Sequence, residues 1–417
     1  MSIGYACITV GVPDTVLSSC VMKNASPERL KELIEHNLNS LENMISYNAE
    51  NAIKLFRISS DLIPFGSSPA NTLSWQDIFK EKFESISKKI SQNGIRVSMH
   101  PGQYTVLNSP DSEVVKKSIE DLRYHFNVLK LLGTKSESKI ILHVGGVYGD
   151  KVSALARFCE NFSCLDDEIK ERIAIENDER NYNAEDVLDL SQKLGIPAVF
   201  DNLHNSINPS GISDENTLIN LFAQTWKQKD GRQKIHYSEQ KPNAKAGSHS
   251  DSVSAKKFLD FYKKINGSSL DIMLEVKDKN LSAVKCLNLL SEEKNIKALE
   301  NEWSKYKYKV LEMSPTCYGS IRELLKDKTA YPAEDFYSLI EEALISPLSK
   351  QNIENAALHI WGYFKKYASQ AERKGFFTRL ENYLDGKASL LAVKNFLLKL
   401  AQKYDEKYLL HSYYFWI

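Results

Sequence analysis

Two kinds of hydrophobic and polar pattern alternate along the 417-residue chain. Short runs rich in β-branched residues predict strands, and longer runs with apolar residues three or four positions apart predict the helices between them. The predicted strands span residues 3–10, 52–60, 94–100, 138–146, 172–178, 196–204, 232–238 and 269–278. Eight strands in strict alternation with helices favour an α/β fold, a TIM (β/α)8 barrel, over an open doubly wound sheet.

The helical pattern is clear in two segments, residues 26–51 and 112–133. Ser26 precedes the first segment and Glu28 follows closely, so we expect Ser26 to be the N-cap. One more helix is predicted over residues 280–297, after the last strand. No glycine-rich phosphate-binding pattern follows the first strand, which weakens the alternative of a dinucleotide-binding fold.

The last part of the chain has a different pattern. It is helical and rich in aromatic residues, with a strand conceivable only at the tail. We therefore predict two domains, a barrel over residues 1–300 and a small all-α domain over residues 305–417. The aromatic residues of HIWGYFKK, residues 359–366, are most simply core. The alternative is a surface that contacts DNA or a partner through Lys365, Lys366 and the aromatic residues nearby.

The composition limits where a DNA-binding surface can lie and in which compartment the protein is expected. Hydrophobic residues make up 42% and charged residues 26% of the chain, and the formal net charge is zero. Any DNA-binding surface must therefore be local, because no overall basic field is present. The first residues lack a basic segment, no apolar run approaches ~20 residues, and the six cysteines form no C-x-x-C pair. We expect a cytoplasmic protein without a membrane segment, with its thiols reduced.

Candidate chemistry gathers where the predicted strands end. In a TIM barrel the active site lies at the carboxyl ends of the strands, so side chains at these positions should converge. Five of the nine histidines and three carboxylates lie there or just beyond: His100, His143, Glu176, Asp201, His204, His236, His249 and Glu275. This set has more ligands than one ion needs, and its mixed nitrogen and oxygen donors suit zinc or manganese. The pattern predicts a multinuclear metal site.

The other histidines and one lysine need separate interpretations. The remaining histidines lie in helical patterns and are taken as structural: His36, His125, His359 and His411. Lys234 shares a strand face with His236, two residues on. From the residues alone, a side chain that points to solvent is favoured. The alternative is a lysine inside the cluster, either neutral or carbamylated to form an anionic bridging ligand.

Six motifs carry a resemblance to a known family. In chain order they are FRISSDLIPFGSSP, HPGQYTVLNSP, ILHVGGVYGDK, IAIENDER, FDNLHN and GSHSD. Their order, spacing and local sequence resemble the UV damage endonucleases of bacteria and fungi, over about residues 1–290. The resemblance implies a TIM barrel related to endonuclease IV. It also implies an enzyme that nicks DNA 5′ to UV photoproducts, with UV-damaged duplex DNA as its partner, and we expect it to act as a monomer.

The resemblance also implies roles for single residues. The eight strand-end residues match the family's metal-binding positions, which hold up to three divalent ions, usually manganese. Lys234 matches a lysine that is carboxylated in the family, and we take Lys234, Glu176 and Glu275 as catalytic. Gln103 and Tyr104 match a pair that enters the DNA helix at the lesion. Tyr5 matches an aromatic residue near the lesion pocket, and the phosphate-contact candidates are Arg57, Lys277 and Lys279.

The chain departs from the family at two positions. An asparagine that faces the lesion in the family is Thr9 here, and a histidine found in many members is Ser68 here. Two other functions are also consistent with a metal-bearing barrel. A sugar-phosphate isomerase would have a small closed pocket and no need for Gln103 and Tyr104. A damage-binding module would use structural metals. A structural zinc site is complete with four ligands, so the eight candidate ligands of this chain argue against that function.

Overall fold

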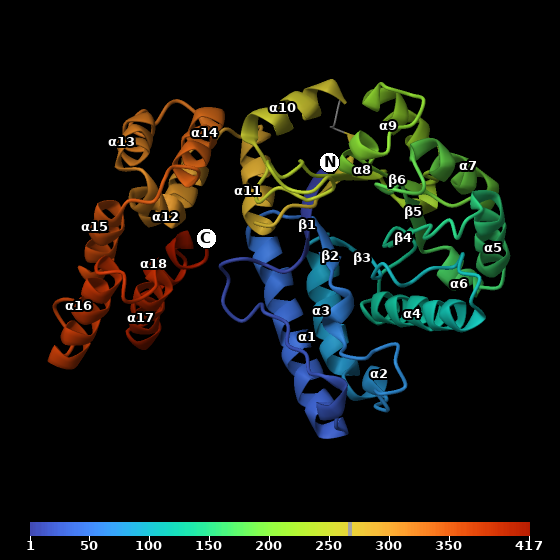
Figure 1. Ribbon diagram of the computed structural model, residues 1–417, viewed down its shortest axis with the longest axis horizontal. Coiled ribbons are helices and arrows are strands. Elements are labelled where there is room, and N and C mark those ends of the chain that lie inside the picture. Colours follow the sequence, from blue (N-terminus) through green and yellow to red (C-terminus); the bar gives the residue numbers. More distant parts are fainter. Residues whose placement is uncertain (266–268) are drawn as a thin grey trace. The chain divides into compact units, whose positions relative to one another are not determined.

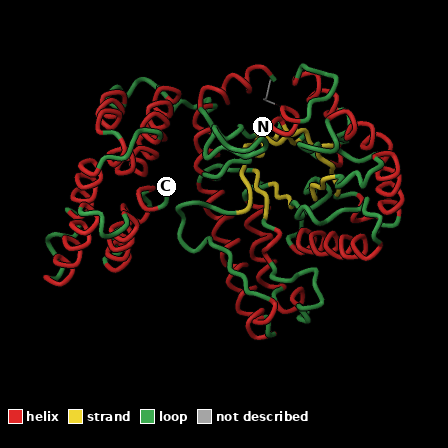
Figure 2. The backbone as a smooth tube through the Cα atoms, viewed as in Figure 1, coloured by secondary structure: helices red, strands yellow, loops and turns green. Residues whose placement is uncertain are grey.

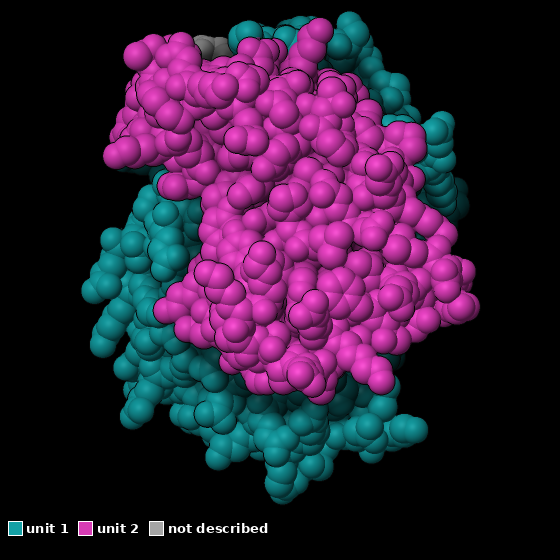
Figure 3. All heavy atoms as spheres, turned by 90° about the vertical axis from the view of Figure 1, so that its left-hand side faces the viewer, with its two compact units in different colours: residues 1–9, 13–253, 259–284 teal, residues 10–12, 254–258, 285–417 magenta. Residues whose placement is uncertain are grey.

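The computed structural model describes residues 1–265 and 269–417 of the chain. These residues form two compact units, coloured separately in Figure 3. The first unit comprises residues 1–9, 13–253 and 259–284, and the second comprises residues 10–12, 254–258 and 285–417. The first unit therefore ends ahead of the predicted domain limit at residue 300.

The first unit is a closed barrel of eight parallel strands, which confirms the predicted fold class (Figures 1 and 2). Each strand pairs with the next along the chain, and β1 pairs with β8 to close the barrel. The strands are β1 (Ser2–Cys7), β2 (Leu55–Ile58), β3 (Arg96–Met99), β4 (Ile140–His143), β5 (Ile173–Glu176), β6 (Ala198–Asp201), β7 (Lys234–Tyr237) and β8 (Asp271–Leu274). Almost every strand residue is buried, because helices cover the outside of the barrel.

Helices connect the strands, as the alternating pattern predicts. Ser26 is the N-cap of the first helix, and its side chain accepts a hydrogen bond of 3.2 Å from the backbone of Arg29. The helices up to the end of the barrel are α1 (Pro27–Glu50), α2 (Trp75–Ile78), α3 (Lys80–Gln92), α4 (Ser112–Leu131), α5 (Lys151–Ser163), α6 (Asp167–Lys170), α7 (Ala184–Leu194), α8 (Asn202–Ile207), α9 (Glu215–Ala223), α10 (Ala255–Lys264) and α11 (Asn280–Leu289).

Two predicted elements differ from the structure. The strand predicted over residues 196–204 ends at Asp201, because the side chain of Asp201 caps α8 and accepts a 2.7 Å hydrogen bond from the backbone of His204. His204 is therefore a helical residue. The single helix predicted over residues 280–297 is two helices, since α11 ends at Leu289 and Asn295 caps a new helix.

The second unit is helical, as predicted. Its helices are α12 (Ile296–Met313), α13 (Pro315–Leu324), α14 (Ala333–Leu344), α15 (Lys350–Trp361), α16 (Gln370–Leu384), α17 (Leu390–Lys403) and α18 (Lys407–Leu410). The tail forms a 3-10 turn, η5 (Tyr413–Phe415), where a strand was conceivable. Ile360, Trp361 and Phe364 of the HIWGYFKK segment are buried in the core of this unit, so the core interpretation is confirmed for them. None of the described helices combines the length and apolar character that crossing a membrane requires.

Candidate metal centre

The barrel brings the strand-end residues together at one rim. His143 and Glu176 are the last residues of β4 and β5 and are paired in register. Asp201, the last residue of β6, is paired in the same way with His236 of β7. His100 and Glu275 directly follow β3 and β8. Parallel strands end at the same edge, so six residues far apart in the sequence meet there.

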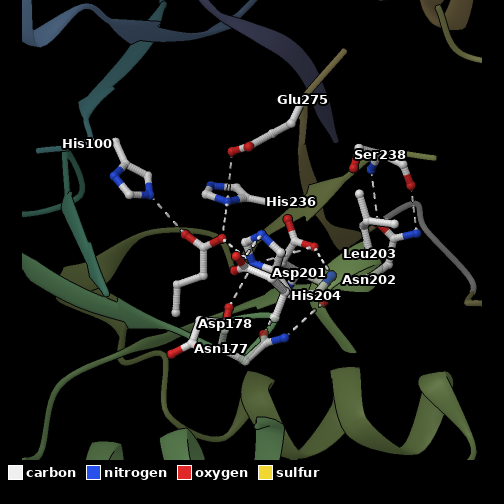
Figure 4. A network of polar contacts seen from close by, with 12 residues as sticks. His100, Asn177, Asp178, Asp201, Asn202, Leu203, His204, His236, Ser238 and Glu275 are labelled. Carbon is white, nitrogen blue, oxygen red and sulfur yellow. Dashed lines mark hydrogen bonds and ion pairs between the residues drawn. The ribbon is translucent and has the colours of Figure 1, made fainter. Parts of the chain in front are cut away.

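Glu176 is the residue around which the others gather. Its Oε2 lies 3.1 Å from Nε2 of His100, and its Oε1 lies 3.1 Å from Nδ1 of His236. The same oxygen, Oε1, is 3.5 Å from Nδ1 of His204. Nδ1 of His236 is also 3.1 Å from Oε1 of Glu275. Figure 4 shows His100, His236 and Glu275 pointing toward a common centre.

The donor atoms form two overlapping groups. One group contains His100, His143 and Glu176, and the other contains Glu176, Asp201, His236 and Glu275. Within each group, the ligand atoms lie within 4.8 Å of one another. Glu176 belongs to both groups, and one carboxylate can bridge two ions through its two oxygens. The arrangement therefore suits more than one ion.

Backbone carbonyls orient two of the histidines. Nδ1 of His100 is 3.0 Å from the carbonyl oxygen of Pro101, and Nδ1 of His204 is 2.9 Å from that of Asn177. A ring whose Nδ1–H donates to a carbonyl carries its lone pair on Nε2, which is the usual arrangement of a metal-ligating histidine. Nε2 of His100 faces Glu176, in the centre of the cluster.

Several buried donor atoms at the centre have no hydrogen-bond partner among the described residues. They are Nδ1 of His143, Nε2 of His236 and Oδ2 of Asp201. Buried polar atoms are rarely left without a partner, because the loss of hydration is costly. The unpartnered atoms and the mixed nitrogen and oxygen donors together fit divalent ions of the zinc or manganese type.

The surroundings shift the pKa values of His143 and His204 in opposite directions. Burial lowers the pKa of His143 to about 4, so this ring is neutral and able to bind a metal at physiological pH. Burial also acts on His204, but the carboxylates of Asp201 and Glu176 outweigh it and raise the pKa of His204 to about 9. Burial likewise disfavours the ionised form of Glu176, yet the neighbouring His236 and His100 hold its pKa well below the usual range.

Lys234 and His249 belong to neither donor group, and they differ in burial. Lys234 is fully buried, so the solvent-facing alternative favoured from the residues alone is wrong. Burial lowers its pKa well below the usual range of a lysine. His249 lies at the outer edge, where its side chain is 29% exposed and its Nδ1 is 3.8 Å from Oε2 of Glu275.

Gln103 and Tyr104 lie on an exposed loop after β3. Tyr104 is 83% exposed, although it is a large aromatic residue. Both residues line a cavity of about 650 Å³, which also has His143, Tyr148 and Arg180 among its lining residues. The loop and a candidate metal ligand thus border the same cavity, as expected if damage recognition and cutting occur side by side.

The other predicted contact residues are more enclosed. Tyr5 is fully buried, and its hydroxyl bonds to Thr9 at 2.6 Å and to Asn48 at 2.8 Å. Arg57 is also largely buried and pairs with Glu275 through its Nη1. Burial disfavours its charge, but Glu275 outweighs this effect and raises the pKa of Arg57. The hydroxyl of Ser68 accepts a hydrogen bond of 3.2 Å from the backbone of Ala70 within its own turn.

The two lysines suggested as phosphate contacts differ in exposure. The side chain of Lys277 is 61% exposed and lies 3.7 Å from Asp251. Lys279 is half-buried, and burial lowers its pKa. Both follow Glu275 closely in the chain, so they lie near the rim rather than at the opposite end of the barrel.

Sequence reasoning missed residues that support the cluster. The side chain of Asn177 donates a 3.0 Å hydrogen bond to the carbonyl of Asp201 and accepts one of 2.9 Å from its backbone N–H. Ser60 donates a hydrogen bond of 2.8 Å to the carbonyl of His100, and Ser60 in turn lies 2.9 Å from Nε2 of His125. Asn177 directly follows Glu176, and this position is the one signal that the sequence offers.

Comparisons with known proteins point in one direction. Residues 2–307 match the family described as UV-endonuclease UvdE, and residues 307–417 match a protein family of unknown function, DUF1722. A UV DNA damage endonuclease of Clostridium perfringens is 44% identical over 351 residues, which cover 83% of this chain and 84% of that protein. A UV DNA damage endonuclease of Bacillus velezensis is 32% identical over 295 residues, which cover 70% and 91%.

A solved structure agrees with these matches. The crystal structure of SacUVDE superposes with a TM-score of 0.67 at 39% sequence identity, and the match covers 70% of this chain and 99% of that one. The similarity therefore extends over the whole length of that protein.

Proposed function

The chain belongs to the UV-endonuclease UvdE family, and we propose that it nicks the DNA backbone immediately 5′ to UV photoproducts. The proposed lesions are cyclobutane pyrimidine dimers and 6-4 photoproducts, and we extend the proposal to abasic sites. Cleavage leaves a 3′-hydroxyl and a 5′-phosphate, an end that a polymerase can extend. The observation that carries the proposal is the buried group of donors around Glu176 at the barrel rim.

Divalent ions, up to three and of the manganese type, are the proposed cofactors. The proposed ligands are the residues of both donor groups, together with His204, His249 and Lys234, which lie outside these two groups. When bound, such ions supply Lewis acidity, which makes water a stronger nucleophile and offsets the negative charge that develops on the phosphate. Because Glu176 belongs to both donor groups, it is the residue suited to bridge two ions.

The protein's own side chains have distinct tasks in this proposal. Arg57 pairs with Glu275 and holds this carboxylate ionised and in place. Asn177 holds the backbone of Asp201 and the ring of His204, so it fixes the orientation of two ligands. Lys234 is buried with no acceptor for its amine among the described residues. Carboxylation, in which its neutral amine adds to carbon dioxide and releases a proton, gives an anionic ligand.

Gln103 and Tyr104 are the proposed lesion probe. A UV photoproduct joins two pyrimidines covalently, so the duplex pairs and stacks poorly there and is easier to open. The amide of Gln103 can bond with the bases left opposite. The ring of Tyr104 can stack in the vacated space, and such stacking is worth ~1–3 kcal/mol per base. The 83% exposure of Tyr104 supports this role. The lesion and phosphate contacts of Tyr5 and Arg57 stay predictions.

A nicking assay tests the proposal directly. The substrate is a labelled duplex with one cyclobutane dimer, incubated with and without Mn²⁺, beside the same duplex without damage. We expect a single metal-dependent cut immediately 5′ to the dimer. Absence of a cut with every divalent metal, in a protein that is folded, would contradict the proposed function. Turnover of phosphorylated sugars would then favour the isomerase alternative.

Point variants assign the reaction to the cluster. His143→Ala and Glu176→Ala should each lower the nicking rate by at least about a hundredfold, because each removes a ligand of the centre. The matched control is His359→Ala, which alters an exposed histidine on α15. Circular dichroism shows whether each variant is folded. Near-normal nicking by a folded Glu176→Ala protein refutes the metal assignment.

A second pair of variants tests the probe. Replacing Gln103 and Tyr104 together by alanine should reduce the preference for damaged over undamaged duplex and leave metal binding unchanged. Binding of both duplexes is measured by fluorescence anisotropy in EDTA, so that no cutting interferes. An unchanged preference removes the probe role from these residues but leaves the cutting site intact.

A further inference from the structure

The helical unit has an unusual composition. Twelve of the twenty tyrosines of the chain lie within residues 285–417. The same residues include twenty lysines and arginines and seventeen acidic residues, a small excess of positive charge, whereas the whole chain is neutral. Aromatic rings and local positive charge in one small unit are features of surfaces that bind nucleic acid. The family match of this unit assigns it no function.

Three tyrosines of this unit form a packed group. The hydroxyls of Tyr308 on α12 and Tyr363 after α15 are 2.8 Å apart. The rings of Tyr363 and Tyr408 are nearly parallel, at 10°, with their centroids 5.9 Å apart. Tyr308 is buried and lies edge-on to both rings, whereas Tyr363 and Tyr408 are half-buried. Part of each of these two rings therefore remains at the surface.

Two cations lie over aromatic rings of this unit. Nζ of Lys307 is 5.0 Å from the ring centroid of Tyr308 and 5.8 Å from that of Tyr408. The guanidinium of Arg322 lies 5.7 Å from the ring centroid of Tyr318, and Tyr318 packs on Trp303 with centroids 5.4 Å apart. Burial lowers the pKa of Lys307, and the neighbouring Arg322 lowers it further. The two positive charges are therefore close enough to repel each other.

Neither cation is within ion-pair distance of a carboxylate in the described parts of the chain, residues 1–265 and 269–417. Other lysines of α12 are different, since Lys305 pairs with Glu302 at 2.7 Å and Lys309 pairs with Glu312 at 3.0 Å. Like charges held together without an anion favour the binding of one. A phosphate would relieve the repulsion between Lys307 and Arg322.

We propose that this surface, made by Lys307, Arg322, Tyr318, Tyr363 and Tyr408, binds single-stranded nucleic acid. Phosphates would lie against the two cations, and unpaired bases would stack on the half-buried rings. A duplex cannot offer its base faces for stacking, and an acidic peptide has charge but no such faces. The proposal goes beyond the cutting of damaged DNA and does not rest on it, because none of these residues belongs to the barrel unit.

Fluorescence anisotropy with the full-length protein tests the surface. The probe is a fluorescein-labelled thymidine 20-mer without damage, titrated in EDTA at several salt concentrations, so that the barrel does not cut it. The double variant Lys307→Gln/Arg322→Gln should bind about tenfold more weakly. The slope of log affinity against log salt should fall by about 1.4, or about 0.7 per lost phosphate contact.

A control with the same change of charge separates this surface from general electrostatics. Lys326→Gln/Lys328→Gln removes two lysines just beyond the end of α13 that already pair with Glu323 and Glu300. It should leave the affinity within about twofold of the wild type. An equal loss of affinity in both double variants overturns the proposal. An unchanged affinity of Lys307→Gln/Arg322→Gln overturns it as well.

Stacking is tested separately. Tyr408→Leu removes the ring and should weaken binding at least about fivefold, whereas Tyr408→Phe keeps the ring and should bind normally. Near-UV circular dichroism verifies that both variants keep the packing of the helical unit. Equal affinity of the Leu and Phe variants excludes stacking on this ring and overturns the proposal. Poly-glutamate serves as a competitor that has charge but no bases. If it displaces the probe as effectively as unlabelled oligonucleotide does, at equal concentrations of residues and nucleotides, the proposal is also overturned.

Discussion

The hydroxyl of Thr105 donates a hydrogen bond of 2.7 Å to Oδ2 of Asp121, which ties the loop of Gln103 and Tyr104 to α4. The other oxygen of the same carboxylate, Oδ1, accepts a 2.8 Å hydrogen bond from Ser67. One side chain thus holds two rim loops. Thr105 is buried while the neighbouring Tyr104 is exposed, so the contact fixes the base of a loop whose tip is free to meet DNA.

Thr105→Val removes the hydroxyl and keeps the shape of the side chain. We expect the free energy of unfolding to fall by about 1–2 kcal/mol, because a buried hydrogen bond to a carboxylate is lost. The preference for damaged duplex should fall as well, because Tyr104 is held less firmly. Thr105→Ser keeps the donor and should behave like the wild type in both measurements. A stability loss with full damage preference limits Thr105 to a structural role.

Metal removal should destabilise the barrel. Glu176, Asp201 and Glu275 place three buried carboxylates in one donor group, and bound cations offset their repulsion. Mn²⁺ at a hundred times its dissociation constant should stabilise the protein by about 2.7 kcal/mol relative to EDTA. Differential scanning calorimetry measures this as a rise in the melting temperature. Glu176→Gln should reduce the rise, whereas Glu42→Gln, far from the rim on α1, should keep it. The same rise in both variants would place the ion elsewhere.

Most of the cluster could be predicted from the sequence, because strand ends are predictable and a barrel places all of them at one edge. His100, His143 and Glu176 follow from this rule alone. Lys234 shows the limit of that reasoning. Strand alternation puts it on the same face as His236, but the repulsion between a charged lysine and the cations of a metal cluster argued for a side chain that points to solvent. The structure follows the strand alternation.

Contacts that depend on exact spacing between distant segments were not predictable. Arg57 and Glu275 are 218 positions apart, and their pairing follows only once β1 closes the barrel between β2 and β8. The bond from His204 to Asn177 uses a backbone carbonyl, which every residue has, so residue types give no signal. The break between α11 and α12 was missed because residues 290–295, LSEEKN, contain no proline or glycine to mark the end of a helix.

A buried ion pair at the other end of the strands supports stability rather than chemistry. Nζ of Lys139, which is fully buried next to β4, lies 2.5 Å from Oδ1 of Asp230 and 2.7 Å from the carbonyl of Glu171. Lys139→Met leaves the Asp230 carboxylate buried without its partner. We expect the free energy of unfolding to fall by about 3–5 kcal/mol, while the nicking rate per folded molecule is unchanged.

Urea unfolding measures this effect, and a surface pair provides the control. Lys130 and Glu168 are 2.9 Å apart, but their side chains are 56% and 69% exposed. Lys130→Met should therefore change the free energy of unfolding by less than about 1 kcal/mol. If Lys139→Met costs no more than Lys130→Met, the buried pair contributes nothing that a surface pair does not.

Stability in mild acid should depend on Glu42, which joins α1 to α3. Burial alone would raise its pKa, but Lys82, Ser85 and Lys89 bind the carboxylate and lower the pKa to about 2. The folded-state pKa thus lies below the unfolded value, so the folded state holds fewer protons. The stabilisation is present above the ordinary carboxylate pKa of about 4.3 and is lost as the pH falls from there toward 2.

Glu42→Gln removes this titration. We expect the variant to be less stable at pH 7 by about 1 kcal/mol, a value reduced for the solvent that reaches the paired lysines. The difference from the wild type should shrink as the pH falls from 4.3 toward 2, because protonated Glu42 loses the same ion pairs. Urea titrations at pH 7, 4 and 3 measure it. Glu32→Gln, on the same helix but in an exposed pair with Arg29, should show no such trend. A Glu42 difference that stays constant over this range excludes the ion pairs as its source.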